Sequence, residues 1–149
     1  MRTAVQQRTE DYEKLINRHR HRSFRGVARV RFDNLTFPNP PPLSQQEPPP
    51  LDPHNVSRLA KIFEKGCYNS LPENRILVIL NESQFAAALR LLDISPEAFR
   101  ADGDDTHELV SPLTQPFACY DGRHRIEAAK RCLHGGDRWW SADILVTNG

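Results

Sequence analysis

The segment FACYDGRHRIEAAKRCL, residues 117–133, gathers residue types that can bind an anion. Its pattern predicts a short strand, a tight turn with the helix N-cap, and then a helix over residues 123–133. The first backbone N–H groups of a helix lack partners within it, and the helix dipole makes that end attractive to anions. Basic side chains at that end are unfavourable unless an anion sits among them. The predicted phosphate-binding residues are Asp121, Gly122, Arg123, His124 and Arg125.

Each residue after the strand has an expected role. Gly122 allows a close approach of the backbone, His124 and Arg125 neutralise phosphate, and Arg123 adds charge at the rim. An alternative stays open, in which the two arginines pair with surface carboxylates and His124 is an ordinary exposed residue. The carboxylates considered for that pairing are Asp102, Asp104 and Asp105.

Three segments predict the strands that position this turn. Alternating residues over 26–32 predict a strand with one buried face. The continuous apolar run in NRILVIL, residues 74–80, predicts a buried central strand, and residues 139–146 predict another. Two adjacent tryptophans start this last segment, and we expect one of Trp139 and Trp140 in the core and the other at the surface.

Two segments between these strands predict helices. Asp52 is a candidate N-cap and Pro53 suits the first helical position, so a helix is expected to follow them. Residues 82–100 predict helical structure with a break before Pro96. The polar and acidic residues 101–115 predict a mobile loop.

Residues 1–25 are expected to form a peripheral N-terminal helix and a basic segment, followed by a domain over residues 26–149. The segment RHRHRSFRGVARVR, residues 18–31, contains six arginines and no acid, so it is a candidate for nucleic-acid contacts, with a solvated helix end and strand edge as the alternative. Its arginines are Arg18, Arg20, Arg22, Arg25, Arg29 and Arg31. The proline-rich residues 38–53 predict an extended surface loop, which is also a candidate site for a partner protein.

Composition narrows the class of protein. Twenty Lys and Arg stand against 19 Asp and Glu in 149 residues, so an anionic partner must be met by a local patch rather than by the overall charge. The odd number of cysteines, three, argues against a disulfide framework, and no apolar stretch approaches membrane-spanning length. These features predict an intracellular protein, nuclear or cytoplasmic. No zinc or other metal site is predicted, because the set Cys119, His124, Cys132 and His134 lacks a known ligand spacing.

The box GRHRIEAA, residues 122–129, resembles the second conserved box of ParB-type chromosome-partitioning domains, Gly-Glu-Arg-Arg-x-x-Ala-Ala. It is also similar to the sulfiredoxin box Gly-Cys-His-Arg-Tyr-Glu-Ala. The upstream order of NPPP, the helix NVSRLAKIFEKGC and the strand ILVIL is similar to that of ParB. A closer likeness is to an uncharacterised domain family of filamentous fungi, whose members have a C..G.HRI.A box and a Gly-Asp-x-Trp-Trp ending, as this sequence does. This resemblance covers about residues 26–146.

This resemblance implies an α+β fold of the ParB/sulfiredoxin-like type, with helices packed around a small mixed sheet. In both families the box binds the phosphates of CTP or ATP, so the expected ligand is a nucleotide, ATP or CTP with Mg²⁺. The sulfiredoxin cysteine nucleophile falls at Arg123, which argues against a sulfinic-acid reductase. The ParB glutamate also falls at Arg123, so nucleotide hydrolysis is left open and no catalytic residue is assigned.

The leading expectation is therefore a nucleotide- or phosphate-binding domain. Two other classes of function stay open beside it. One is a nucleic-acid-binding module that uses the arginines of residues 18–31 together with the box as one basic surface for DNA or RNA. The other is a catalytically inactive domain that binds a partner protein.

Overall fold

The computed structural model describes residue 14 and residues 23–37, 51–111 and 116–147. Apart from residue 14, which is helical, the segment of the expected N-terminal helix lies outside these residues, as do the arginines at 18, 20 and 22 and most of the proline-rich loop. Within the described residues, no helix is long and apolar enough to cross a membrane.

The described strands form one mixed sheet, which confirms the α+β class. The strands are β1 (Phe24–Arg31), β2 (Leu35–Thr36), β3 (Ile76–Asn81), β4 (Phe117–Asp121) and β5 (Trp139–Thr147). Their order across the sheet is β1-β5-β3-β4-β2. β5 pairs with β1 antiparallel and with β3 parallel, while β4 pairs with β3 antiparallel and with β2 parallel.

The central strand is β3, as its continuous apolar run predicts. All five of its apolar residues are buried, because both faces of the strand are covered. Ile76, Val78 and Leu80 belong to the main core, and Leu77 and Ile79 belong to a second cluster with Tyr120 and Leu145. Ile76, the first residue of β3, is fully buried.

Four helices are described, and their bounds follow sequence signals. They are α2 (Pro53–Phe63), α3 (Glu82–Leu92), α4 (Pro96–Asp102) and α5 (Arg123–Cys132). The side chain of Asp52 caps α2 by accepting from the His54 backbone N–H, as predicted, and the expected break before Pro96 separates α3 from α4. Short 3-10 helices cover 32–34, 72–74 and 135–137.

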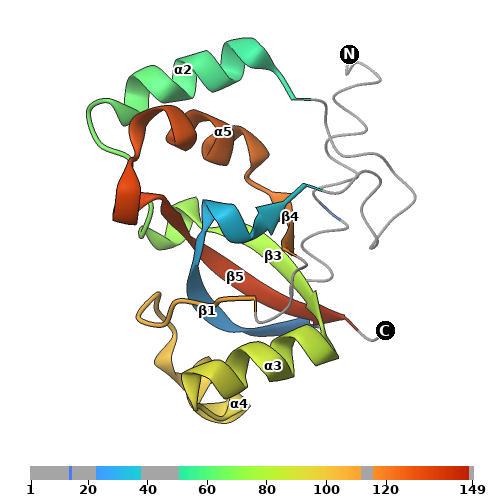
Figure 1. The fold of residues 1–149 in the computed structure, drawn as a ribbon. Coiled ribbons are helices and arrows are strands. Elements are labelled where there is room, and N and C mark those ends of the chain that lie inside the picture. Colours follow the sequence, from blue (N-terminus) through green and yellow to red (C-terminus); the bar gives the residue numbers. More distant parts are fainter. Residues whose placement is uncertain (1–13, 15–22, 38–50, 112–115, 148–149) are drawn as a thin grey trace.

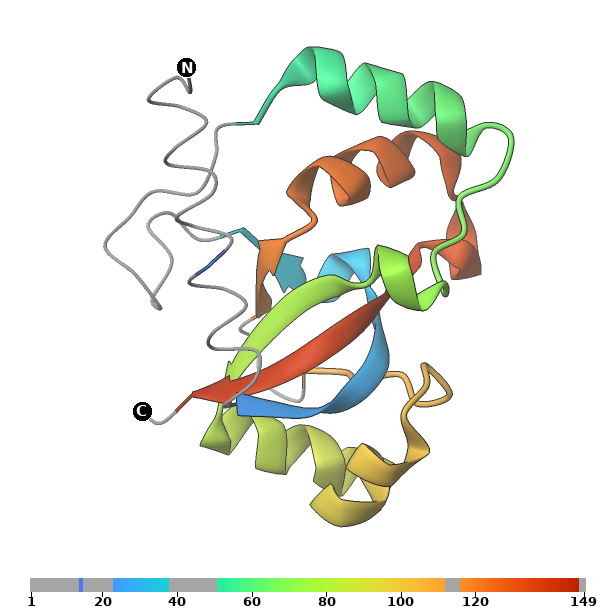
Figure 2. The ribbon, with the colours of Figure 1, turned by 180° about the vertical axis from the view of Figure 1, so that it is seen from behind.

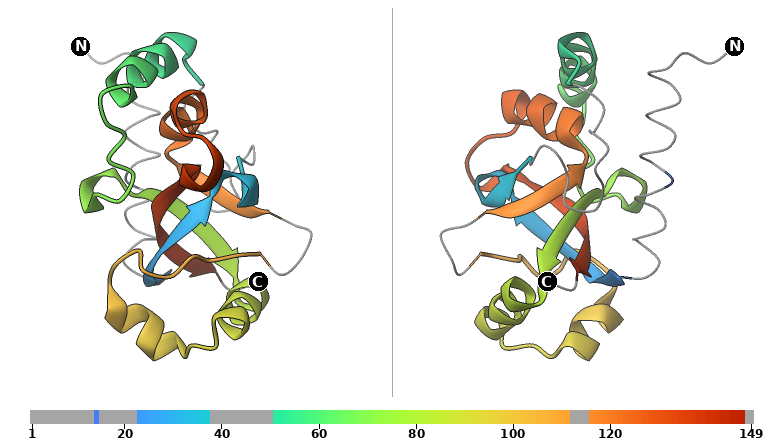
Figure 3. Two further views of the ribbon diagram at one scale, coloured as in Figure 1. Left: turned by 60° about the vertical axis from the view of Figure 1, so that its left-hand side comes forward. Right: turned by 90° about the vertical axis from the view of Figure 1, so that its right-hand side faces the viewer.

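The helices gather at two ends of the molecule, with the strands between them (Figure 1). α2 and α5 lie together at one end and α3 and α4 at the other, and the reverse and rotated views agree (Figures 2 and 3). α5 lies between α2 and the strands. Ile126 and Ala129 of α5 join the main core, whereas Ala128 packs against Val56 and Ala60 of α2.

The segment after α4 is held to β1 in the part that is described. The Leu109 backbone N–H donates to the Arg29 carbonyl, and the Arg29 N–H donates to the His107 carbonyl, each at 2.9 Å. Leu109 is fully buried. The expectation of a mobile loop over 101–115 therefore does not hold for residues 107–109, because the apolar Leu109 finds a place in the core.

Candidate functional site

Gly122 is the N-cap of α5 and packs directly on the central strand. Its φ is 115°, in the left-handed region, and a Cβ placed there would lie 2.2 Å from Cγ2 of Ile76. Real side chains do not approach so closely, so only glycine lets α5 begin at this distance from β3. The close backbone approach expected of Gly122 thus occurs within the protein, between helix and sheet.

Arg125 binds backbone carbonyls rather than projecting into solvent. Its Nη1 donates to the carbonyl oxygens of Asn74 at 3.2 Å and Arg75 at 3.0 Å. The indole Nε1 of Trp140 donates to the same Asn74 oxygen at 2.7 Å. A charge-assisted hydrogen bond of this kind fixes the first turn of α5 against the entrance to β3. Arg125 therefore positions the turn.

His124 joins the starts of α2 and α5. Its Nε2 accepts a hydrogen bond of 2.9 Å from the Asp52 backbone N–H, so in the neutral ring Nδ1 carries the proton. Near the other ends, the Cys132 thiol donates to the Ala60 carbonyl at 3.3 Å. The two helices consequently run parallel, and their N-terminal ends lie together.

Burial lowers the pKa of His124, and the positive charge of Arg123 lowers it further, against the opposing effect of the Asp52 carboxylate. Protonation would also put a hydrogen on Nε2, where the Asp52 N–H now donates.

This arrangement predicts a loss of stability in acid. The folded protein takes up the His124 proton less readily than the unfolded chain, so stability is lost as the pH falls below about 6.5. We expect the unfolding midpoint to drop more between about pH 7.5 and 5.5 in the unmodified protein than in His124→Gln, whose amide oxygen accepts without titrating. Thermal unfolding followed by circular dichroism measures this difference. The exposed His134→Gln is the control, and equal pH profiles for the unmodified and His124→Gln proteins would contradict the assignment.

Arg123 is exposed, and its guanidinium lies 5.8 Å from the ring centroid of Phe37. The carboxylates considered as partners of the turn contact other groups. Asp102 pairs with His107, Asp104 accepts from Thr106, and Asp105 lies 3.9 Å from Arg29. The described contacts of Arg123 and Arg125 thus differ from the surface ion pairs of the alternative interpretation. Nothing is described of the Asp121 side chain.

The described arginines of the basic segment contact groups within the protein. Arg25 lies 3.7 Å from Glu82, and Arg31 donates to the Gly135 carbonyl at 3.3 Å. Arg29 lies 3.9 Å above the Trp139 ring and donates to the Asp105 carbonyl. These contacts tie β1 to its neighbours.

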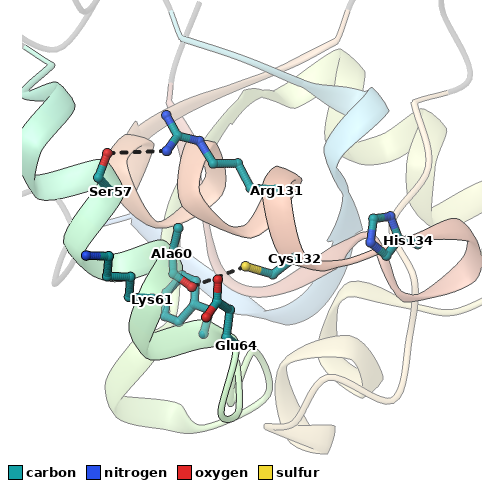
Figure 4. A pocket seen from close by; sticks show the side chains of 8 residues that line it. Ser57, Ala60, Lys61, Glu64, Arg131, Cys132 and His134 are labelled. Carbon is teal, nitrogen blue, oxygen red and sulfur yellow. Dashed lines mark hydrogen bonds between the residues drawn. The ribbon is translucent and has the colours of Figure 1, made fainter.

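A groove of about 600 Å³ lies between α2 and the end of α5 (Figure 4). Arg131 crosses it to donate to the Ser57 hydroxyl at 3.3 Å. The residues that line it are Ser57, Ala60, Lys61, Phe63, Glu64, Arg131, Cys132 and His134. Sequence reasoning missed this groove because it depends on how two helices pair. The small residues Ala60 and Ala128, which let them approach, were the available signal.

The described cysteines and candidate metal ligands concern a separate kind of site, one for thiol or metal chemistry. Burial, with Cys132 nearby, raises the pKa of the Cys67 thiol to about 11, which leaves little thiolate at neutral pH. Cys119 is buried in β4. In the described part of the chain, no three His, Cys, Asp or Glu side chains gather as metal ligands.

Most of the chain matches a known protein family. The model of a family described as the N-terminal domain of a protein of unknown function, DUF3723, matches residues 23–148. No curated protein and no solved structure matches the chain.

Proposed function

The chain belongs to the DUF3723 family, and we propose that its N-terminal domain binds a nucleotide through phosphate at the start of α5. The proposal includes a ParB/sulfiredoxin-like fold. Its support is the sequence resemblance of the box GRHRIEAA together with the place of that box, directly after β4 and at the first turns of α5.

The observation that carries the proposal is an uncapped, basic helix start. α2, α3 and α4 are each capped by a side chain that accepts from a first-turn N–H, whereas Gly122 offers α5 no such group. The first-turn N–H groups of α5 therefore suit an anion, and the exposed guanidinium of Arg123 lies beside them.

The side chains of the turn divide between binding and support. Arg123 supplies the charge. His124, whose Nε2 accepts from the Asp52 backbone N–H, supplies an Nδ1–H donor in its neutral form. Arg125 holds the turn in place through the Asn74 and Arg75 carbonyls. The proposal is one of binding, with ATP or CTP arriving with its Mg²⁺, and it assigns no catalytic residue.

Thermal unfolding in the presence of ATP, CTP, GTP and UTP, with and without Mg²⁺, tests the proposal. A nucleotide at about a hundred times its dissociation constant adds roughly 2.7 kcal/mol, which raises the midpoint of a chain of this size by about 5–10 °C. Arg123→Gln should reduce the shift, because it removes the exposed charge without touching the core. Arg90→Gln, an exposed arginine of α3 at the other end of the molecule, should leave the shift unchanged. The absence of a shift with every nucleotide would refute nucleotide binding.

A further inference from the structure

The outer face of α2 carries a stripe of basic residues. His54, Arg58 and Lys61 are four and three residues apart, which places them on one face of the helix, and Lys65 continues the spacing in the turn that follows. All four are exposed. The opposite face of α2 is buried against α5 through Val56 and Ala60. The stripe therefore points away from the domain, on the outermost helix at that end (Figure 1).

α5 extends this basic surface. Arg131 reaches across to Ser57, on the side of α2 that also presents Lys61 to the groove (Figure 4). Arg58 donates to the Asn55 side-chain oxygen at 2.6 Å. Both arginines thus have neutral partners in these contacts, which orient the guanidinium groups without neutralising their charge. We call Arg58, Lys61, Lys65 and Arg131 the α2–α5 basic face.

Charge is divided between the two ends of the molecule. Residues 52–65 and 123–134 together carry seven Lys and Arg against three Asp and Glu, whereas residues 82–102 carry two against four. Over the whole chain the numbers are nearly equal, 20 against 19. The positive potential is therefore concentrated at the α2–α5 end, where an anionic partner is attracted.

We propose that the α2–α5 basic face binds nucleic acid through its phosphodiester backbone. From His54 to Lys61 the stripe runs about 10 Å along α2, the length of roughly three base-pair steps, and Lys65 continues it into the following turn. Arg58, Lys61 and Lys65 carry charges of one sign three and four residues apart, and such a row of cations suits a regular row of phosphates, which charge alone can bind.

Two other anionic partners fit the face less well. A protein interface has an apolar core, whereas the residues of this stripe are basic. Insertion into a membrane surface needs a free apolar helix face, and that of α2 is occupied by α5. The proposed face uses neither Arg123 nor the β1 arginines, so it is independent of nucleotide binding at the start of α5.

Fluorescence anisotropy of the full chain with labelled duplex DNA, single-stranded DNA and single-stranded RNA tests the proposal and identifies the preferred form. With about four phosphate contacts, the slope of log K against log salt should be near −3 to −4, and affinity should fall on the order of a hundredfold from about 50 to 200 mM salt. The triple variant Arg58→Gln, Lys61→Gln, Lys65→Gln keeps good helix formers, and its slope should shrink by about three. Arg90→Gln should bind as the unmodified protein does.

Several outcomes would overturn this assignment. One is no binding to any of the three nucleic acids at about 50 mM salt. Another is a triple variant that folds, by circular dichroism, and binds with unchanged slope. Loss of binding in an Arg18→Gln, Arg20→Gln, Arg22→Gln variant alone would place the contacts in the basic segment instead. Equally tight binding to polyglutamate would indicate an acidic protein as the partner.

Discussion

Gly122→Ala is expected to lower the free energy of unfolding by about 3–4 kcal/mol. Two costs add at this position. A non-glycine residue is strained at a φ of 115°, and the added Cβ would lie 2.2 Å from Cγ2 and 3.0 Å from Cβ of Ile76. Ile76 is fully buried in the central strand, so it has little room to give way. Since domains of this kind are stable by only about 5–15 kcal/mol, the loss is a large part of the total.

Alanine substitutions at two other glycines, compared by urea unfolding, separate the cost of backbone strain from the cost of the steric clash. Gly135 has a φ of 58°, and a Cβ added there would meet no atom within 4 Å, so Gly135→Ala reports backbone strain alone, about 1 kcal/mol. Gly136 has neither feature, and Gly136→Ala should change stability by no more than about 0.5 kcal/mol. A Gly122→Ala variant no less stable than Gly135→Ala would show that α5 can move away from β3.

The same contact explains part of what the sequence could and could not predict. Sequence reasoning placed Gly122 correctly at the turn between a strand and a helix, because glycine at that point has a local signal. It expected a close approach of the backbone at Gly122, and the structure identifies Ile76 of the central strand as the neighbour. Ile76 lies 46 residues earlier in the chain, and no local pattern connects the two.

Arg125 and His124 show the same limit. Their positions on the first turn of α5 follow from spacing, but their partners come from distant segments: the carbonyls of Asn74 and Arg75, and the N–H of Asp52. Backbone groups have no residue-type signal in a sequence, so these contacts could not be predicted. The buried strand β3 could be, because its apolar run reports burial of both faces directly.

The α2–α5 basic face combines both kinds of information. The spacing of Arg58, Lys61 and Lys65 is visible in the sequence. Whether they form an ordinary solvated helix face or part of a binding surface depends on which residues the fold places beside them. In the fold, Arg131 joins these residues from 66 positions beyond Lys65. The arginines of residues 18–31 are close together in sequence and so predict a basic patch, yet Arg25, Arg29 and Arg31 contact groups within the protein.

Of the two adjacent tryptophans, one is in the core and the other is nearer the surface, as expected. Substitution of the buried one is the second change for which we expect a large loss of stability. Trp140 is fully buried, with its ring centroid 5.6 Å from that of Phe63, whereas Trp139 is only partly buried beneath Arg29. Trp140→Ala should cost about 3–5 kcal/mol, because it removes a large core side chain and its hydrogen bond to Asn74. Trp139→Ala loses partial burial and a cation–π contact, for about 1–2 kcal/mol.

Trp140→Phe keeps the experiment informative if the alanine variant fails to fold. Phenylalanine retains an aromatic ring against Phe63 but lacks the indole N–H, leaving Arg125 as the side-chain donor to the Asn74 oxygen. We expect an intermediate loss of about 1–3 kcal/mol in urea unfolding followed by circular dichroism. Trp139 and Trp140 are the two tryptophans of the chain, so each single variant also leaves one fluorescent reporter. An equal loss for Trp139→Ala and Trp140→Ala would contradict the assignment of Trp140 to the core. A larger loss for Trp140→Ala than for Trp140→Phe or Trp139→Ala is the expected order. It would be consistent with a first turn of α5 that is held in place by the Asn74 carbonyl, which accepts from both Trp140 and Arg125.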